Sequence, residues 1–233
     1  MKKYQLAGLD FIIDQNGQPF FIEANSLPGF YKQQLTDDKK IQTLKKLFGR
    51  KLIILTPKEK KLTKRQINLM QSITETFVAY NEDNHEQWKT IKDRKGKIHK
   101  SGTLLVWNNL TKKNFSKKFR IINAQETCQL IKNKIRTAEL MKQNNIPIPK
   151  TFAIENANEI PQILKGNSIK NYVLKPIFGS KGDDITFHQQ SDKIQLPPRK
   201  MLLQEQIILK KLYNRYWDLR ALIVNGKYIG AIK

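Results

Sequence analysis

Residues 173–182 have the sequence VLKPIFGSKG, and this stretch decides the fold class. Its first part is a short apolar run that predicts a buried strand, which ends at Lys175 and Pro176. The turn that follows consists of Gly179, Ser180, Lys181 and Gly182. The backbone amides of such a turn can approach phosphate oxygens next to the fixed cation of Lys175. A strand that leads into this turn predicts a phosphate site in an α/β protein.

Two later segments extend this prediction. The first consists of Gln204, Glu205, Gln206 and Ile207. It predicts an edge strand whose backbone groups are available to an adenine. In the second segment, Asp218 and Arg220 flank a leucine, and Arg220 supplies a cation for a phosphate or for negative charge that develops in a reaction. Together with the turn, these segments predict a nucleotide site.

The N-terminal half predicts a hairpin and a small α/β unit. Two Phe- and Ile-rich runs within residues 8–25 enclose a turn with Asn16 and Gly17, and a helical pattern then continues to a stop at Gly49. A strand at 51–55 and a strand at 103–107 are expected, separated by a helix with apolar positions Ile67, Met70, Ile73 and Phe77. The charged residues 81–101 are expected to form a loop.

The C-terminal half predicts helices followed by strands. Asn123 is expected to cap a helix, a second helix runs over about 134–143, and the alternate prolines in residues 146–149 enforce an extended segment. The expected strands cover residues 172–176, 201–208, 219–224 and 227–232, and they are predicted to form one mostly antiparallel sheet.

Composition excludes several classes of protein. No stretch approaches the roughly 18 apolar residues of a membrane span, and the N-terminus lacks the apolar core of a signal peptide, so a cytoplasmic location is expected. The single cysteine, Cys128, excludes an internal disulfide, and the three histidines lack zinc-ligand spacing. The net charge of +23 suits a polyanion, but lysine predominates over arginine and is spread in short runs. A lysine-rich surface is therefore favoured over nucleic-acid binding, which stays an alternative.

The succession of motifs over residues 123–233 resembles the ATP-grasp family, in particular the glutathione synthetases and the ribosomal-protein S6-type glutamate ligases. The resemblance implies ATP as cofactor, with Lys134 and Lys175 on its phosphates, Glu205 and Ile207 on the adenosine, and Arg220 as the catalytic cation. It also implies an α/β (α+β) fold with antiparallel sheets flanked by helices and a small Rossmann-like unit. One departure is the pair Asp183 and Asp184, which places negative charge where the family usually has a glycine.

Residues 6–30 resemble the metal-binding strands that close the same family's site. Asp10, Glu23 and Asn25 provide hard oxygen ligands, and strand alternation places Glu23 and Asn25 on one face. The resemblance implies Mg²⁺, or alternatively Mn²⁺, between the ATP phosphates. The alternative is a plain hairpin with solvated acids.

The implied reaction joins a carboxylate and an amine. ATP phosphorylates the carboxylate of a small molecule or peptide, and the amine then attacks the acyl phosphate to form an amide. Positioning and charge neutralisation suffice for phosphoryl transfer, so lysines, an arginine and metal-holding carboxylates meet its needs. The alternative is a non-catalytic protein that binds nucleic acid or ATP on a degenerate ATP-grasp scaffold.

The two half-sites occur in reversed order, because the metal strands close the family's domain and here come first. Three domains are predicted: residues 1–48, the C-terminal metal-binding part of an ATP-grasp module; residues 50–122, a small unit like the domain that precedes ATP-grasp; and residues 123–233, a truncated nucleotide-binding part. The favoured interpretation is a piece of a tandem ligase that needs further segments or a partner chain. The alternative is a rearranged module whose N-terminal hairpin packs beside Lys134 and Lys175.

Overall fold

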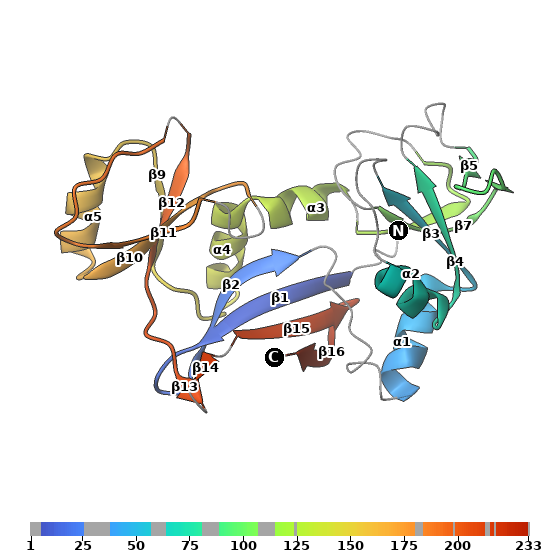
Figure 1. Cartoon of the computed structure of the whole chain (residues 1–233), viewed down its shortest axis with the longest axis horizontal. Coiled ribbons are helices and arrows are strands. Elements are labelled where there is room, and N and C mark those ends of the chain that lie inside the picture. Colours follow the sequence, from blue (N-terminus) through green and yellow to red (C-terminus); the bar gives the residue numbers. More distant parts are fainter. Residues whose placement is uncertain are drawn as a thin grey trace. The chain divides into compact units, whose positions relative to one another are not determined.

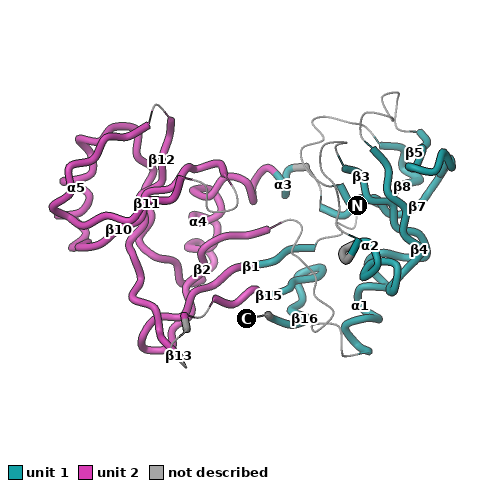
Figure 2. Tube along the Cα trace, viewed as in Figure 1, with its two compact units in different colours: residues 1–8, 26–128, 221–232 teal, residues 9–25, 129–220, 233 magenta. Residues whose placement is uncertain are grey.

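A computed structural model describes most of the chain. It covers residues 6–25, 38–56, 64–80, 89–106, 115–123, 125–179, 184–197, 199–212, 215–216 and 218–232. The elements divide into two compact units (Figures 1 and 2). Unit 1 comprises residues 1–8, 26–128 and 221–232, and unit 2 comprises residues 9–25, 129–220 and 233. No helix among the described residues is long and apolar enough to cross a membrane.

Unit 1 is built on a parallel sheet with the strand order β4-β3-β7-β8. Its strands are β3 (Lys51–Thr56), β4 (Glu75–Tyr80), β7 (Gly102–Val106) and β8 (Phe119–Ile122). The three strand pairs are all parallel, so the predicted small α/β unit is confirmed. The strands at 51–55 and 103–107 are found nearly as predicted.

Helix α1 (Asp38–Phe48) packs on this sheet. Its apolar face buries Leu44, Leu47 and Phe48 in the same core as Leu52 and Ile54 of β3. The helix ends at Gly49, as predicted, because a φ of +69° is a conformation that glycine adopts without steric cost.

Helix α2 (Lys64–Gln71) is shorter than predicted. Ile73 lies beyond its end, and Phe77 belongs to strand β4. The helical spacing of four apolar residues continued across a helix–strand junction, so periodicity did not reveal the junction. Residues 81–88 of the predicted loop lie outside the described residues, and the rest contains a small antiparallel ribbon of β5 (Ile91–Lys92) and β6 (Ile98–His99).

Unit 2 contains an antiparallel sheet with the strand order β11-β10-β12-β9. Its strands are β9 (Thr151–Ile154), β10 (Asn171–Pro176), β11 (Thr186–Gln189) and β12 (Met201–Glu205). One face carries Tyr172, Leu174 and Leu203, which pack against Ile160 and Leu164 of helix α5 (Glu159–Gly166). The opposite face of the strands is therefore available to polar groups.

A second sheet has the strand order β16-β15-β1-β2. Its strands are β1 (Leu6–Ile13), β2 (Pro19–Asn25), β15 (Asp218–Val224) and β16 (Lys227–Ile232). The predicted N-terminal hairpin is confirmed, because β1 and β2 are neighbours around the turn at Gly17. The prediction of a single C-terminal sheet is wrong: β10 and β12 belong to one sheet, and β15 and β16 belong to this one.

The remaining elements of the C-terminal half are helices and one short ribbon. Helices α3 (Gln125–Lys132) and α4 (Lys134–Gln143) follow the predicted pattern, and β13 (Lys211–Leu212) pairs with β14 (Arg215–Tyr216). The predicted cap residue Asn123 lies two residues before α3, and its side-chain amide exchanges two hydrogen bonds with the backbone of Leu6. The observed class is mixed α/β with a parallel sheet and antiparallel sheets, as predicted.

Candidate functional site

Lys175 lies at the end of β10 on the face opposite the apolar core of unit 2. Its side chain is almost fully buried, with 5% of the residue exposed, and its Nζ donates a hydrogen bond of 2.8 Å to Gln204 Oε1. The amide of Gln204 in turn donates to Thr151 Oγ1 over 2.8 Å, and this hydroxyl donates to the carbonyl of Pro149. A chain of three side chains from β10, β12 and β9 thus fixes the position of the ammonium group.

Lys134 approaches the glycine turn from helix α4. Asn133 caps this helix, because its side chain accepts from the backbone N–H of Arg136, and Lys134 is the first helical residue. The Lys134 Nζ donates to the carbonyl of Gly179 over 2.6 Å, and its backbone N–H donates to the carbonyl of Ile177. The start of α4 is therefore joined to the beginning of the turn.

The rest of the predicted phosphate turn is only partly described. Gly179 is exposed, whereas Ser180, Lys181 and Gly182 lie outside the described residues. Asp184, one of the two acids that depart from the family pattern, forms an ion pair of 2.7 Å with Arg199. The negative charge of this acid is therefore balanced locally.

The three predicted metal ligands come together on β1 and β2. The Asn25 amide donates to Asp10 Oδ2 over 2.8 Å and to Glu23 Oε1 over 3.4 Å. Arg220 of β15 binds both oxygens of Asp10, with Nε at 2.5 Å and Nη2 at 2.7 Å. This bidentate pair links the predicted catalytic arginine to the predicted metal site.

These groups all belong to unit 2, and Glu23 acts electrostatically on both lysines. Burial and the positive charge of Lys134 lower the pKa of Lys175, the carboxylate of Glu23 opposes this shift, and the resulting pKa is about 8. Burial also lowers the pKa of Lys134, and Glu23 again opposes the shift. Two buried or half-buried cations and one carboxylate therefore share a single electrostatic environment.

The segment 204–207 differs from the prediction in one respect. β12 pairs with β10 on one side and with β9 on the other, so it is a central strand and not an edge strand. The backbone N–H of Glu205 donates to the carbonyl of Lys150, and that of Gln206 donates to the carbonyl of Asn171. Ile207 lies just past the end of β12, and Asp218 is exposed at the start of β15.

The donor set suits a hard cation. Among the described residues, no group of three His, Cys, Asp or Glu side chains could hold a metal ion. The predicted set differs from such a group because it has two carboxylates and one amide, from Asp10, Glu23 and Asn25. Carboxylate and amide oxygens are both ligands for Mg²⁺. Glu23 and Asn25 fit such an ion if the amide turns its oxygen inward, while both oxygens of Asp10 already accept hydrogen bonds from Arg220.

Two residues of this arrangement were missed in the sequence analysis. Asn133 precedes a helical pattern, so its position signals an N-cap. Thr151 carries no such signal, because its role depends on the pairing of Thr151 with Gln204 across two strands.

Part of the chain is similar to a known family. Residues 131–233 match the RimK-like ATP-grasp domain. The predicted resemblance to the ATP-grasp family is therefore confirmed over this segment, which is less than half of the chain.

The relatives are distant and longer than the matched region. The tetrahydromethanopterin:alpha-L-glutamate ligase of Methanosarcina acetivorans is 30% identical over 126 residues, which is 48% of this chain and 38% of the relative. The ligase of the same name from Methanocaldococcus jannaschii is 28% identical over 122 residues, or 48% of this chain and 40% of the relative. The alignments thus span about two fifths of these relatives.

Solved structures are less similar. A RimK domain ATP-grasp protein from Sphaerobacter thermophilus has a TM-score of 0.46 and 13% identity, covering 67% of this chain and 64% of its own. D-alanyl-alanine synthetase A from Vibrio cholerae has a TM-score of 0.44 and 6% identity, covering 74% of this chain and 67% of its own.

Proposed function

We propose that this protein is an ATP-dependent ligase that joins a carboxylate to an amine through an acyl phosphate. The observation that carries the proposal is that Lys134, Lys175 and Glu23 lie in one compact unit, near enough for the carboxylate to raise the pKa of both lysines. Two cations and an acid that influence each other provide both kinds of charge that an ATP–metal complex needs.

Each group has a proposed task. Lys175 and Lys134 neutralise the phosphates, with the turn at Gly179 providing backbone amides, and the segment 204–207 holds the adenosine. Glu23 and Asn25 would hold Mg²⁺, with Asp10 hydrogen-bonded to Asn25, and the ion when bound would supply charge neutralisation for the phosphates. Arg220 stabilises the negative charge of the transferred phosphoryl group. Mn²⁺ is an acceptable substitute because the ligands are the same hard oxygens.

The substrates follow from the distant relatives. Because both relatives are named as glutamate ligases, we propose glutamate as the amine and a small molecule or peptide as the carboxylate. Segments beyond this chain or a partner chain would supply the contacts that select the carboxylate.

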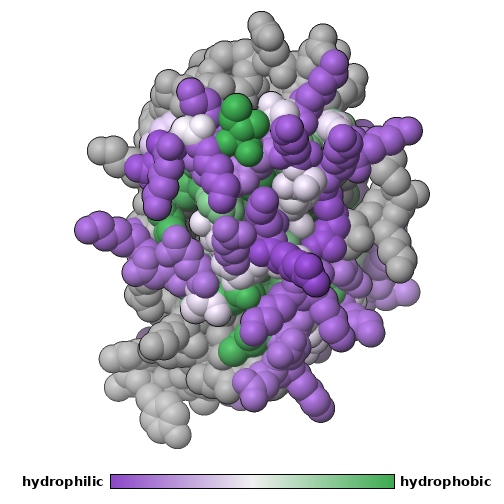
Figure 3. Space-filling model, turned by 90° about the vertical axis from the view of Figure 1, so that its right-hand side faces the viewer, coloured by the Kyte–Doolittle hydropathy of each residue, from purple (hydrophilic) through white to green (hydrophobic). Residues whose placement is uncertain are grey.

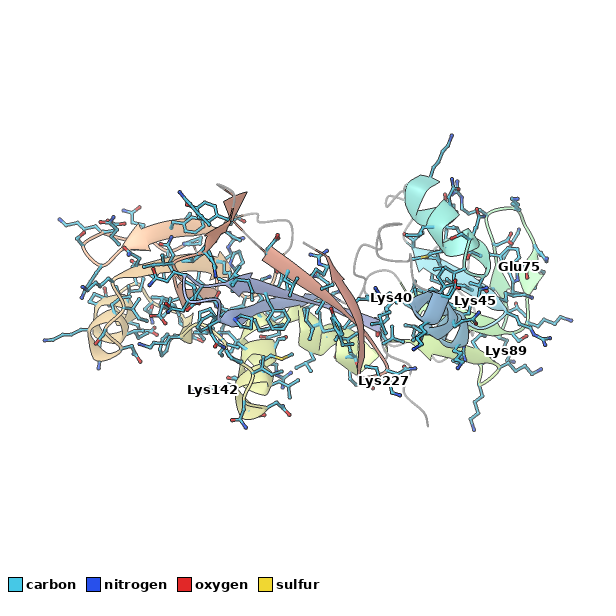
Figure 4. The ribbon with its side chains drawn as sticks, turned by 90° about the horizontal axis from the view of Figure 1, so that it is seen from below. Lys40, Lys45, Glu75, Lys89, Lys142 and Lys227 are labelled. Atoms are coloured by element: carbon cyan, nitrogen blue, oxygen red, sulfur yellow. The ribbon has the colours of Figure 1, made fainter. Side chains whose placement is uncertain are left out.

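Thermal unfolding with Mg-ATP tests the nucleotide site. Mg-ATP should raise the melting temperature of the protein, and Lys175→Ala should remove this increase, since a ligand that binds only the folded state stabilises it. Glu23→Gln should remove the dependence on Mg²⁺. Lys142→Ala on the outer part of α4 is the matched control, because this lysine is exposed (Figure 4).

The acyl phosphate has a direct chemical test. With ATP, Mg²⁺ and candidate carboxylates, hydroxylamine should trap the intermediate as a hydroxamate, and ADP should form in equal amount. Mg-ATP binding without ADP or hydroxamate formation over a broad panel of carboxylates would instead support a non-catalytic ATP-binding protein.

A further inference from the structure

The positive charge of the chain is concentrated in unit 1. This unit has 26 Lys and Arg against 9 Asp and Glu, a net charge of +17 out of the total of +23. Most of unit 1 lies outside residues 131–233, the segment that matches the ATP-grasp domain. The nucleotide site therefore does not account for the charge. Figure 3 shows a face of the molecule on which hydrophilic side chains predominate and apolar ones form small separate patches.

One dense cluster of cations among the described residues is the basic hairpin, defined here as residues 89–100 with the sequence KTIKDRKGKIHK. Strands β5 and β6 pair in it, and Gly96 takes a φ of +84° in the turn. Six cations are exposed on this short segment: Lys89, Lys92, Arg94, Lys95, Lys97 and Lys100. Figure 4 shows Lys89 near this hairpin and Lys40 and Lys45 on α1.

The one acid of the hairpin binds groups of its own turn. Asp93 is buried, its Oδ1 accepts from the backbone N–H groups of Lys95 and Lys97, and its Oδ2 lies 2.9 Å from Nε2 of the buried His99. Burial raises the pKa of Asp93, but the hydrogen bonds from His99 and the backbone outweigh this effect and leave the pKa below its ordinary value. The acid thus shapes the turn from inside the fold, and the six cations remain exposed.

The turn of the hairpin is fixed to the sheet of unit 1. The backbone N–H of Arg94 donates to the carbonyl of Val78 in β4 over 2.8 Å. The Arg94 guanidinium lies over the ring of Tyr80, and the Lys97 ammonium lies over the ring of Phe77. The like charges of this cluster repel each other, so an anionic partner that binds there would lower the electrostatic free energy of the cluster.

The chemistry favours nucleic acid over an acidic polypeptide. A duplex carries one negative charge per about 1.7 Å, whereas an extended chain of acidic residues carries at most one per roughly 3.3 Å. The release of condensed counterions therefore contributes more binding free energy when a lysine cluster binds nucleic acid than when it binds an acidic polypeptide. Lysine is also a point charge that binds phosphate without reading bases, in contrast to the fork of arginine.

We propose that the basic hairpin of unit 1 binds the phosphodiester backbone of nucleic acid without sequence specificity. This function is separate from the ligase site, which lies in unit 2.

Salt-dependent binding of a labelled mixed-sequence oligonucleotide of about 20 nucleotides, single-stranded and duplex, tests the proposal. The triple variant Lys92→Gln, Lys95→Gln, Lys100→Gln should weaken binding at least about tenfold at roughly 0.1 M salt and reduce the slope of log K against log salt by about 3. The matched control, Lys142→Gln, Lys165→Gln, Lys170→Gln, removes the same charge from exposed positions of unit 2 and should change affinity less than about twofold.

Two further measurements separate charge from folding and from other partners. The triple variant Lys92→Arg, Lys95→Arg, Lys100→Arg should retain affinity, which would show that the glutamine triple acts through charge. Equal losses in the glutamine triple and in the unit 2 control would overturn the proposal, as would competition by polyglutamate as strong as that by unlabelled oligonucleotide. Lys175→Ala, which alters the proposed ligase site in unit 2, should keep the affinity for nucleic acid. A failure of the ligase proposal would therefore not affect the test of the basic hairpin.

Discussion

At the scale of single residues, Lys175 shows how a buried cation is kept available for an anion. The fold removes its ammonium from water but gives it the Gln204 oxygen as a partner and leaves the neighbouring Lys134 charge in place. The resulting pKa of about 8 means that the charge is maintained at neutral pH only by a small margin. A phosphate bound at the proposed site would offset the charges of both lysines and would therefore favour the protonated form of Lys175.

The first prediction concerns pH. Mg-ATP affinity should fall as the pH rises through about 8, because Lys175 loses its proton there and the neutral amine no longer attracts phosphate. The unfolded chain keeps this proton until about 10.5, so the stability of the protein without ligand should rise over the same interval by at most about 1.4 kcal/mol per pH unit. Titration calorimetry and chemical unfolding between pH 7 and about 10 measure both slopes.

Lys175→Met is the control for this pH dependence. It should remove the fall in affinity and the rise in stability together, because the titrating group is absent. A profile that persists in Lys175→Met would assign the titration to another group.

The second prediction concerns Thr151. Thr151→Val removes the acceptor of the Gln204 amide, and the released amide no longer holds its oxygen toward Lys175. Because one hydrogen bond is worth roughly 1 kcal/mol, ATP affinity should fall about fivefold. Thr43→Val, which removes a hydroxyl bonded within α1, is the control and should leave ATP affinity unchanged. Equal ATP affinities of Thr151→Val and the unsubstituted protein would show that the Lys175 ammonium does not depend on the hydrogen bond between Thr151 and Gln204.

At the scale of elements, the buried Asp93 makes the basic hairpin a defined structure. The third prediction is that Asp93→Asn destabilises unit 1 by about 2–4 kcal/mol, because the charge that holds His99 and two backbone N–H groups is lost. Lys95→Gln, at a neighbouring exposed position, should change stability by less than about 0.5 kcal/mol. Urea unfolding followed by the amide exchange of the hairpin gives the comparison.

Acid should also destabilise unit 1, as Asp93→Asn is expected to do. The pKa of Asp93 is lower in the folded state, so its stabilising contribution is present above the unfolded-state value of about 3.8 and is lost as the pH falls through the folded-state value. A hairpin whose amide protection is unchanged in Asp93→Asn would contradict this account.

Elements with a strong local pattern were predicted well, and pairings between distant strands were not. The apolar run of β3, the turn at Gly17 and the stop at Gly49 each follow from local chemistry. β12 was expected at an edge because its own residues cannot show that β9 pairs with it on one side. The same limit explains why the acids of β1 and β2 could be predicted as ligands from a local pattern while Thr151 was missed.

At the scale of the whole molecule, the reversed order of the half-sites gains a physical interpretation. β1 and β2 share a sheet with β15 and β16, and Phe21 of β2 donates its backbone N–H to the carbonyl of Pro147, which lies just after α4. The turn of the hairpin is also tied to the segment after β12, where Gln15 and Lys210 each donate to a carbonyl across the contact. These contacts favour the arrangement in which the N-terminal hairpin completes the site beside the two lysines of the same chain.

The fourth prediction tests whether the half-sites act within one chain. Lys175→Ala and Glu23→Gln each damage one half-site, so each variant alone should lose Mg-dependent ATP binding. A mixture of the two should still fail to bind, because the hairpin and the lysines of one compact unit are held together by backbone hydrogen bonds and do not exchange. Binding of a fluorescent ATP analogue, measured before and after joint unfolding and refolding of the mixed variants, makes the comparison. Recovery of binding in the mixture would show that one chain's hairpin serves another chain's lysines, as a tandem or two-chain ligase requires.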